Sequence, residues 1–311
     1  MIKKNKIVAI QADRLDSMNI KTDTTILLAL EAQKRGFRIF CYETKNLSFI
    51  NGKVYALSKE VTFNINAKNF YTIKNIKKLD LSKVNYILMR QNPPFNMNYI
   101  TATFLLEKIS KKVRIINDPT SVRNIPEKLH SIEFLKLMPP TIFTKDIKEI
   151  EKFKKKYKKI VVKPTHGYGG KNILFINSNL NRNKMSKYIK KHDYVMVQKF
   201  LPQIKYGDKR VFIIAGKIKG AIRRIPVKGS ILSNIGQGGR AVKTNLTKSE
   251  LHIAKIVAKN LKKNKIVFAG IDLISNYLIG DINITSPTGL RNFKDLTEIN
   301  LAVDFWNYLE N

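Results

Sequence analysis

Apolar and polar positions in the first part of the chain form short β-branched runs that alternate with helical patterns. A strand is predicted over residues 6–11, a helix with a nearly continuous apolar face over 24–35, and a second strand over 38–43. This order of elements predicts a βαβ unit and favours an α/β architecture. Further strands are predicted at 86–90 and 113–117, and prolines follow both of them.

The pattern changes after residue 194, where predicted strands follow one another closely. They lie at residues 195–200, 210–215, 221–225, 266–274 and 278–285. Close spacing with glycine-containing turns predicts antiparallel sheet. One helix interrupts these strands at 248–263, and Thr247 with Glu250 forms a capping box at its start.

The composition is that of a globular protein large enough for two domains. The chain has 311 residues, 43% of them hydrophobic, and no apolar run approaches the ~20 residues of a membrane helix. Residues 1–10 are basic and then apolar, but Asp13 and Arg14 follow, which predicts a first strand rather than a signal peptide. The single cysteine, Cys41, excludes an internal disulfide and is typical of the reducing cytoplasm. Its place in a predicted strand favours a buried structural role over a nucleophilic one.

The net charge of +35 raises the question of nucleic-acid binding. Only 12 of the 58 basic residues are arginines, and the lysines are spread along the chain rather than gathered in one patch. Phe153 and Tyr157 interrupt the lysine-rich run 152–159, but their i, i+4 spacing is that of the inner face of a helix. The lysines are therefore interpreted as solvated surface, and no specific nucleic-acid site is expected.

Candidate chemistry begins where an apolar run ends in Lys163 and is followed by Gly167, Gly169 and Gly170. Backbone amides without side chains can wrap a phosphate, and a lysine beside them supplies a point charge. Glycine clusters at hairpin tips are more often plain turns, so this motif alone leaves both interpretations open.

A second group of polar residues lies on the last predicted strand pair. Alternate residues of a strand share a face, so Asp281 and Asn283 present two oxygens side by side, and Asp272 can lie opposite them. Such oxygen ligands suit Mg²⁺, which joins protein carboxylates to substrate phosphates. Solvent-facing strand residues are the alternative, but apolar neighbours alternate with these residues, and two buried acids would repel without a cation between them. Magnesium beside a glycine loop suggests ATP.

Two further features lie between these groups. One is a turn that leads into a predicted strand and contains Asp208, Lys209 and Arg210. An arginine on a strand suits bidentate contact with phosphate or carboxylate, and an aspartate in a turn can accept hydrogen bonds from ribose hydroxyls. A surface ion cluster is the alternative interpretation. Residues 226–240 contain four glycines between two regular elements, which is typical of a lid.

Motifs that match a single known family occur in the family's order over nearly the whole chain. They include Val162-Lys-Pro-x-x-Gly-x-Gly-Gly170, Gly207-Asp-Lys-Arg-Val211 and Asp281-Ile-Asn-Ile-Thr-Ser-Pro-Thr288, with further matches at residues 19–23, 31–36, 89–95, 124–129, 198–202, 224–226, 238–240 and 270–272. Together these segments resemble bacterial glutathione synthetase, of the ATP-grasp superfamily.

The resemblance implies a mixed α/β (α+β) fold. A Rossmann-like pre-ATP-grasp substrate domain would span residues 1–123, and an ATP-grasp domain, with two antiparallel sheets clasping the nucleotide, residues 124–311. A lid-like subdomain would cover about 124–200. The implied activity is a cytoplasmic ligase that uses ATP and Mg²⁺ or Mn²⁺ to join γ-glutamylcysteine to glycine through an acyl phosphate. A homo-oligomer, often a tetramer in the family, is implied as well.

The resemblance also assigns roles to individual residues. For the nucleotide these are Lys128 and Lys163 at the phosphates, Gly167, Gly169 and Gly170 in a flap over them, Gln198, Lys199, Phe200 and Leu201 at adenine, and Asp208 at the ribose. Asp272, Asp281 and Asn283 would hold the metal. Arg210, Arg224, Asn234 and Arg240 would act in catalysis, and Arg90, Ser286 and Thr288 in substrate binding.

Some positions depart from the family pattern. His166 replaces the usual flap acid, Asp281 replaces a glutamate, and Gln91 with Asn92 replaces Lys-Asp. The lid lacks an arginine that the family tends to carry two residues before Asn234. A related ATP-grasp ligase with a different acid or amine substrate is therefore the first alternative. A nucleotide-binding protein without turnover, or a basic nucleic-acid binder, is the second.

Overall fold

The N-terminal part contains the predicted βαβ unit. The computed structural model describes residues 6–67 and 69–311, so part of the basic start of the chain lies outside the described residues. β1 (Ile7–Gln11), α1 (Thr24–Lys34) and β2 (Arg38–Tyr42) follow in order, and the two strands pair in parallel. β6 (Tyr86–Met89) and β7 (Arg114–Ile116) extend the parallel sheet on the other side. These four strands were predicted to within two residues at each end.

An antiparallel extension of this sheet was not predicted. β4 (Lys53–Phe63) pairs with β2, and β3 (Leu47–Ile50) and β5 (Tyr71–Asp80) pair with β4. Cys41 on β2 is buried, and burial raises the pKa of its thiol to about 12, which confirms the expected structural role. The helices beside this sheet are α2 (Met97–Glu107) and α3 (Pro119–Asn124).

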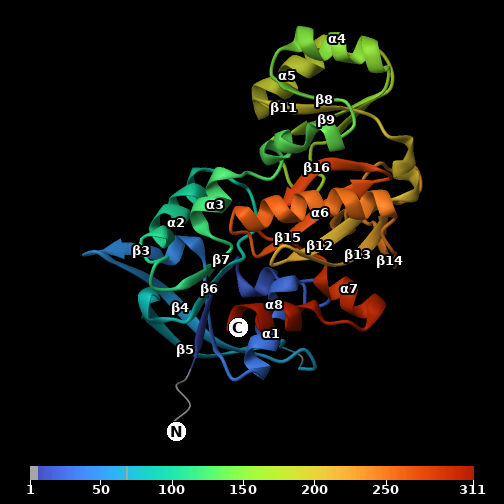
Figure 1. The fold of residues 1–311 in the computed structure, drawn as a ribbon. Coiled ribbons are helices and arrows are strands. Elements are labelled where there is room, and N and C mark those ends of the chain that lie inside the picture. Colours follow the sequence, from blue (N-terminus) through green and yellow to red (C-terminus); the bar gives the residue numbers. More distant parts are fainter. Residues whose placement is uncertain (1–5, 68) are drawn as a thin grey trace.

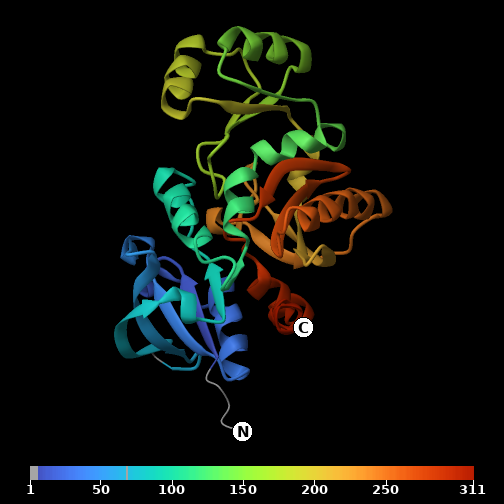
Figure 2. The same cartoon turned by 60° about the vertical axis from the view of Figure 1, so that its left-hand side comes forward.

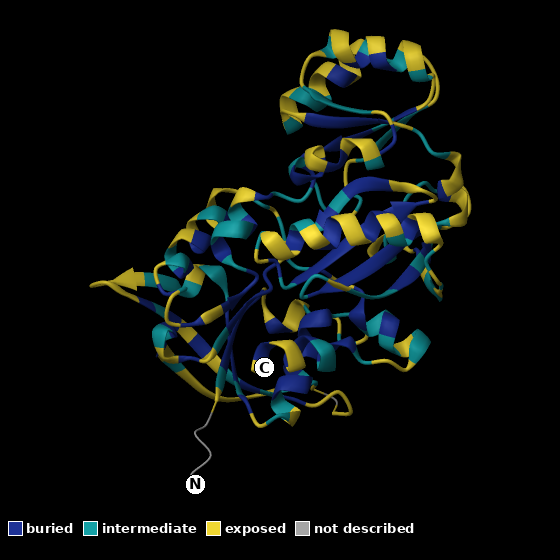
Figure 3. Cartoon of the chain, in the orientation of Figure 1, coloured by how far each residue is buried: buried dark blue, intermediate teal, exposed yellow. Residues whose placement is uncertain are grey.

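A four-stranded antiparallel sheet forms the upper lobe in Figure 1. Its strands, in spatial order, are β10 (Leu174–Ile176), β9 (Ile160–Pro164), β11 (Val195–Lys199) and β8 (Thr141–Thr144). α4 (Ile147–Tyr157) and α5 (Arg182–His192) cover its outer face. The rings of Phe153 and Tyr157 lie 4.5 Å apart and pack on the sheet, as their spacing predicted. In Figure 3 the outward side of α4 is largely exposed, which matches the interpretation of its lysines as solvated.

A five-stranded antiparallel sheet lies below this lobe. Its order is β14 (Arg240–Lys243), β13 (Lys217–Ile225), β12 (Asp208–Ile214), β15 (Phe268–Ile274) and β16 (Tyr277–Asn283). α6 (Lys248–Lys263) packs on it, and the capping box of Thr247 and Glu250 is present. β13 begins four residues before its predicted start, because Ala215 and Gly216 turn the chain at once with positive φ of 52° and 74°.

The C-terminal helices return to the N-terminal sheet. α7 (Leu290–Thr297) and α8 (Leu301–Glu310) lie beside α1, and the indole of Trp306 donates to the carbonyl of Leu28 at 2.8 Å. Asn117 lies at the other junction, where its amide bonds the backbone of Phe268 and Ile284 at 2.6–2.9 Å. The N-terminal part and the five-stranded sheet therefore share a packed base, from which the upper lobe projects in Figure 2.

Single-turn and longer 3₁₀ segments complete the described chain. They lie at Leu15–Ser17, Thr44–Asn46, Leu81–Lys83, Leu129–Leu137, Pro202–Tyr206 and Ile235–Gln237. Among the described residues, no helix combines the length and the apolar character needed to cross a membrane. The predicted domain boundary at 123/124 falls at the end of α3 and stays a prediction.

Candidate active site

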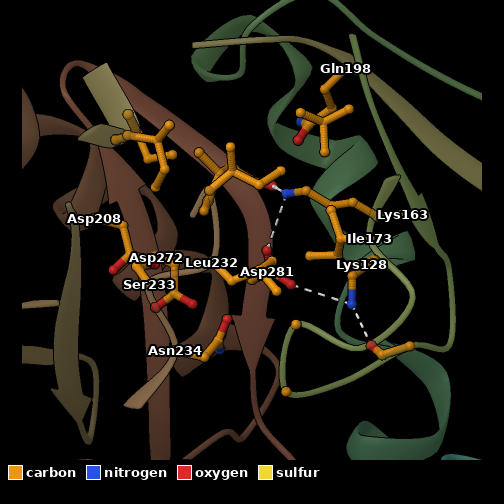
Figure 4. A pocket seen from close by; sticks show the side chains of 18 of the residues that line it. Lys128, Lys163, Ile173, Gln198, Asp208, Leu232, Ser233, Asn234, Asp272 and Asp281 are labelled. Atoms are coloured by element: carbon orange, nitrogen blue, oxygen red, sulfur yellow. Dashed lines mark hydrogen bonds and ion pairs between the residues drawn. The ribbon is translucent and has the colours of Figure 1, made fainter. Parts of the chain in front are cut away.

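A cleft separates the two antiparallel sheets, and Figure 4 shows side chains from both sides reaching into it. Its inner cavity has a volume of about 100 Å³. A second cavity of about 300 Å³ adjoins it on the side of the N-terminal domain. The predicted residues that line the inner cavity are Lys128, Lys163, Gly167, Gly169, Gly170, Gln198, Lys199, Phe200, Leu201, Asp208, Arg210, Arg224, Asn234, Asp272, Asp281 and Asn283.

Asp281 on β16 is held by two lysines from across the cleft. The ammonium nitrogens of Lys128 and Lys163 lie 3.3 Å from its two carboxylate oxygens, and Lys163 also donates to the carbonyl of Ile279 at 2.9 Å. Burial alone would raise the pKa of Asp281, but the two ammonium groups outweigh burial and hold it well below its usual range. Two cations and an ionised acid therefore face one another where the sheets approach.

Asp272 and Asp208 form a second charged group with two arginines. Asp272 accepts from Nη2 of Arg210 at 2.7 Å and lies 2.9 Å from Nη2 of Arg224. Arg224 also donates through Nε to Asp208 at 2.8 Å, and all four side chains are buried. Burial opposes ionisation of Asp272, but the guanidinium groups lower the pKa of this carboxyl below its usual value. The network is satisfied internally, and removing one member would cost about 3–5 kcal/mol.

The donor set for a metal is two carboxylates and one amide. Asp272 and Asn283 lie on neighbouring strands, as predicted, and Asp281 lines the same cavity. The side-chain nitrogen of Asn283 donates to the carbonyl of Gly270 at 3.2 Å, so its amide oxygen is the atom able to ligate. Among the described residues, no cluster of three or more His, Cys, Asp or Glu side chains could hold a metal alone. Mg²⁺ fits this set, because it needs only one or two protein carboxylates when phosphates complete its shell.

The glycine loop lies against the lid, which was predicted at residues 226–240 and covers 226–239 because Arg240 begins β14. Gly169 and Gly170 have positive φ of 62° and 75°, which glycine adopts without strain. A Cβ on Gly170 would lie 2.7 Å from Oδ1 of Asn234, and Gln237 donates to the carbonyl of Gly169 at 3.3 Å. Leu232, Ser233 and Asn234 also reach the cavity in Figure 4, so the segment covers the cleft.

The inner end of the cavity is apolar. Phe200 and Leu201 pack against the buried Ile204, Ile274 and Ile279, and the rings of Phe200 and Phe175 lie 4.3 Å apart. Gln198 is buried beside them and donates to Thr141 at 3.0 Å. An apolar pocket with one buried polar side chain beside it suits a planar heterocycle.

The predicted substrate residues are not all brought together. Ser286 and Thr288 line the second cavity. Arg90 is buried behind them, donates to the carbonyl of Pro287 at 2.9 Å, and lines a small adjoining cavity with both residues. Burial lowers the pKa of its guanidinium to about 10. Arg240 is exposed on β14 and lines neither cavity.

Two family models match the chain and together cover most of it. The N-terminal domain of prokaryotic glutathione synthetase matches residues 7–123, and the ATP-grasp domain of the same family matches residues 127–298. The chain belongs to the prokaryotic glutathione synthetase family. The resemblance carried by the sequence motifs is thereby confirmed.

Curated relatives of the family are similar over nearly their whole length. Glutathione synthetase of Mesorhizobium japonicum is 39% identical over 308 residues, which are 97% of this chain and 97% of the relative. That of Agrobacterium fabrum is 38% identical over 312 residues, or 99% and 97% of the two chains. The expected activity of an ATP-dependent ligase that makes glutathione is confirmed.

A solved structure shares the fold. The ATP-grasp ligase PsnB, complexed with minimal precursor, Mg and ADP, has a TM-score of 0.62 and 13% identity, and the match covers 98% of this chain and 97% of PsnB. At this identity the likeness shows the fold alone, and it confirms the expected ATP-grasp architecture. ATP-grasp ligases use ATP with Mg²⁺.

Glu127 is an acid of the cleft that the sequence analysis did not single out. Glu127 lines both cavities, and Thr285 donates to it at 2.7 Å. The sequence did offer a signal for Glu127, since this residue lies directly before Lys128 in the family motif at residues 124–129. An acid next to a basic residue usually forms a local ion pair, and only the fold shows that Glu127 faces the cleft.

Proposed function

We propose that the cleft joins γ-glutamylcysteine to glycine through an acyl phosphate, with the nucleotide in the inner cavity and the two substrates in the second. The observation that carries this proposal is the joint wall of the two cavities, which includes Arg210, Asn234 and Asn283. A phosphoryl group entering from one cavity can meet a carboxylate from the other only there. Bringing the reactants together in this way, with electrostatic stabilisation, supplies most of the catalysis in such transfers.

Lys128, Lys163 and the glycine flap are proposed to bind the phosphates. Their contact with Asp281, in the same cavity as the apolar Phe200 and Leu201, supports this, because it leaves adenine at Gln198 to Leu201 and the phosphates towards Asp281. The proposed ribose contact of Asp208 requires that this carboxylate share its oxygens with Arg224. Arg210 and Arg224 are proposed to stabilise the charge that develops on the acyl phosphate and on the tetrahedral intermediate.

Asp272, Asp281 and Asn283 are proposed to hold Mg²⁺, with Mn²⁺ as a substitute. The ion would neutralise phosphate charge during the transfer. Lys128 and Lys163 would then exchange part of their contact with Asp281 for phosphate oxygens, because the carboxylate is needed by the metal. Arg90, Ser286, Thr288 and Arg240 are proposed to bind substrate carboxylates, and Arg240 can do so only if its strand end moves towards the second cavity.

The test is phosphate release with γ-glutamylcysteine and each of several amines, measured together with the peptide product. Glycine is expected to give the highest kcat/KM and one phosphate for each glutathione. Because the lid departs from the family pattern at Ile231 to Asn234, the assay should include β-alanine and serine. A higher kcat/KM with another amine or another acid would favour the related ligase instead.

Three further parts of the proposal rest on the family resemblance, on the single cysteine and on the spread of the lysines along the chain. They are a homo-oligomer, often a tetramer in the family, a cytoplasmic location, and the absence of a specific nucleic-acid partner. Light scattering on a sizing column gives the oligomeric state. DNA binding is expected to be weak and lost near physiological salt, because only diffuse phosphate neutralisation is available. Sequence-selective binding at ~0.2 M salt would contradict this.

A further inference from the structure

The second cavity contains an acid to which the proposed roles assign no function. Its lining contains the cations Lys171, Arg210 and Arg224, which suit carboxylates and phosphate. Glu127 is the only acid among the described residues that line it. Both substrates of the proposed reaction also carry an amino group, and an amino group needs a hydrogen-bond acceptor. The lining therefore offers one charged acceptor to an amine.

Other acids near the cleft already have partners. Asp281 is bridged by Lys128 and Lys163, and Asp208 and Asp272 are held by the two arginines. Glu127 accepts a hydrogen bond from the hydroxyl of Thr285, which fixes the carboxylate through one oxygen. Thr285 is itself buried, so the orientation is set by a packed residue. The second carboxylate oxygen remains for a ligand.

Glu127 also lies at a defined place, between the two cavities. It lines the inner cavity as well as the second one, so it lies at their joint wall. Burial raises the pKa of Glu127, although Lys128 and Thr285 oppose this effect. An ionised carboxylate in such surroundings is stabilised by any cation that arrives beside it. An ammonium group of a substrate is such a cation.

We propose that Glu127 binds the amino group of the incoming amine substrate, glycine in the proposed reaction, and holds its nitrogen next to the acyl phosphate. This inference rests on the proposed function, because it needs an acyl phosphate at the joint wall. Glu127 is then a residue that selects an α-amine by charge and places it for attack. The ammonium group gives one proton to the Glu127 carboxylate, the neutral nitrogen bonds to the acyl carbon, and the second proton is lost as the intermediate expels phosphate. Ser286 and Thr288, which line the same cavity, would bind the carboxylate of the same substrate.

The test compares Glu127→Gln with Glu133→Gln, an exposed carboxylate six residues further along the same segment. Glutamine keeps the shape and can still accept from Thr285, but it lacks the charge. We expect KM for glycine to rise ~10- to 100-fold in Glu127→Gln, the usual range for a lost hydrogen bond to a charged group. KM for ATP and for γ-glutamylcysteine should change less than ~2-fold. Glu133→Gln should match the wild type in all three constants.

A neutral nucleophile separates amine binding from a structural role. Hydroxylamine traps an acyl phosphate as a hydroxamate, and it is largely uncharged at neutral pH. Glu127→Gln is expected to keep hydroxamate formation at the wild-type rate while its KM for glycine rises. Equal loss with both nucleophiles, or an unchanged KM for glycine, would overturn the inference. If the glutamine variant does not fold, Glu127→Asp retains the charge with a shorter reach, and it should likewise raise KM for glycine more than that for ATP.

Failure of the proposed function itself gives a different result. The wild type would then form neither glutathione nor hydroxamate from γ-glutamylcysteine and ATP, and the inference would fall with it. Hydroxamate formation by the wild type together with an unchanged glycine KM in Glu127→Gln would instead reject the inference alone.

Discussion

The ammonium nitrogen of Lys128 lies 3.3 Å from a carboxylate oxygen of Asp281, although the two residues come from opposite walls of the cleft. Lys163 reaches the other oxygen at the same distance. One carboxylate thus links the two lysines that are proposed to bind phosphate to the strand that is proposed to bind metal. The charge on Asp281 is therefore important for both sides of the cleft.

Asp281→Asn should lower turnover ~10²-fold or more while nucleotide affinity changes little. The substitution removes a negative ligand and leaves two ammonium groups facing a neutral amide. Turnover should be measured against Mg²⁺ concentration, and nucleotide binding by calorimetry. Asp193→Asn is the matched control, because Asp193 is exposed and its φ of 57° is one that asparagine tolerates. Full activity of Asp281→Asn, or turnover without metal, would reject the metal site.

Local sequence patterns predicted many of the elements, because their signals lie within a few residues. The capping box at Thr247 and the i, i+4 pair of Phe153 and Tyr157 are examples, and both were confirmed. The β4–β5 extension was missed even though residues of β4 alternate between buried and more exposed positions. A strand of that kind can pair on either edge of a sheet, so its partner β2 is set by the tertiary fold.

The site was predictable only in its local parts. The sequence motifs pointed to Lys163, the glycines and the pair Asp281 and Asn283, since each group is local or shares a strand face. The contact of Lys128 with Asp281 joins residues far apart in the chain, and no spacing rule reaches that distance. Glu127 was missed for the same reason, because its partner Thr285 lies 158 residues further along the chain.

The glycine loop allows a matched pair of substitutions. Gly169→Ala and Gly170→Ala both place a Cβ at positive φ and should each cost ~1–2 kcal/mol of local stability. Only at Gly170 would the new atom meet the lid, 2.7 Å from Oδ1 of Asn234, whereas Gly169 has open space. Gly170→Ala should therefore release more phosphate without peptide formation than Gly169→Ala. Equal ratios of phosphate to glutathione in the two variants would show that the flap and lid do not act together.

Glu127 should make the unfolding free energy depend on pH. Burial raises its pKa in the folded state, so between the unfolded pKa of ~4.3 and the folded value the native protein binds more protons than the unfolded chain. Stability due to this group is therefore full below ~pH 4.3 and falls as pH rises through the folded pKa. Glu127→Gln removes the ionisable group, and with it this loss of stability at higher pH. Its Tm relative to the wild type should be higher at pH 7 than at pH 4, and a pH-independent difference in Tm would contradict the buried environment.

The lid segment can be removed without opening the sheet. Ile225 and Arg240 are paired across β13 and β14, so an Asn-Gly turn can replace residues 226–239 and close a two-residue hairpin. The lid contributes Ile231 to Asn234 to the cavity wall, and its expected role is to exclude water from the acyl phosphate. The shortened protein should therefore still bind ATP but release several phosphates for each glutathione, instead of about one. Lys228→Gln, an exposed change within the lid, should keep the wild-type ratio and serves as the control. If the shortened protein ligates glycine with unchanged coupling, residues 226–239 are an ordinary surface loop.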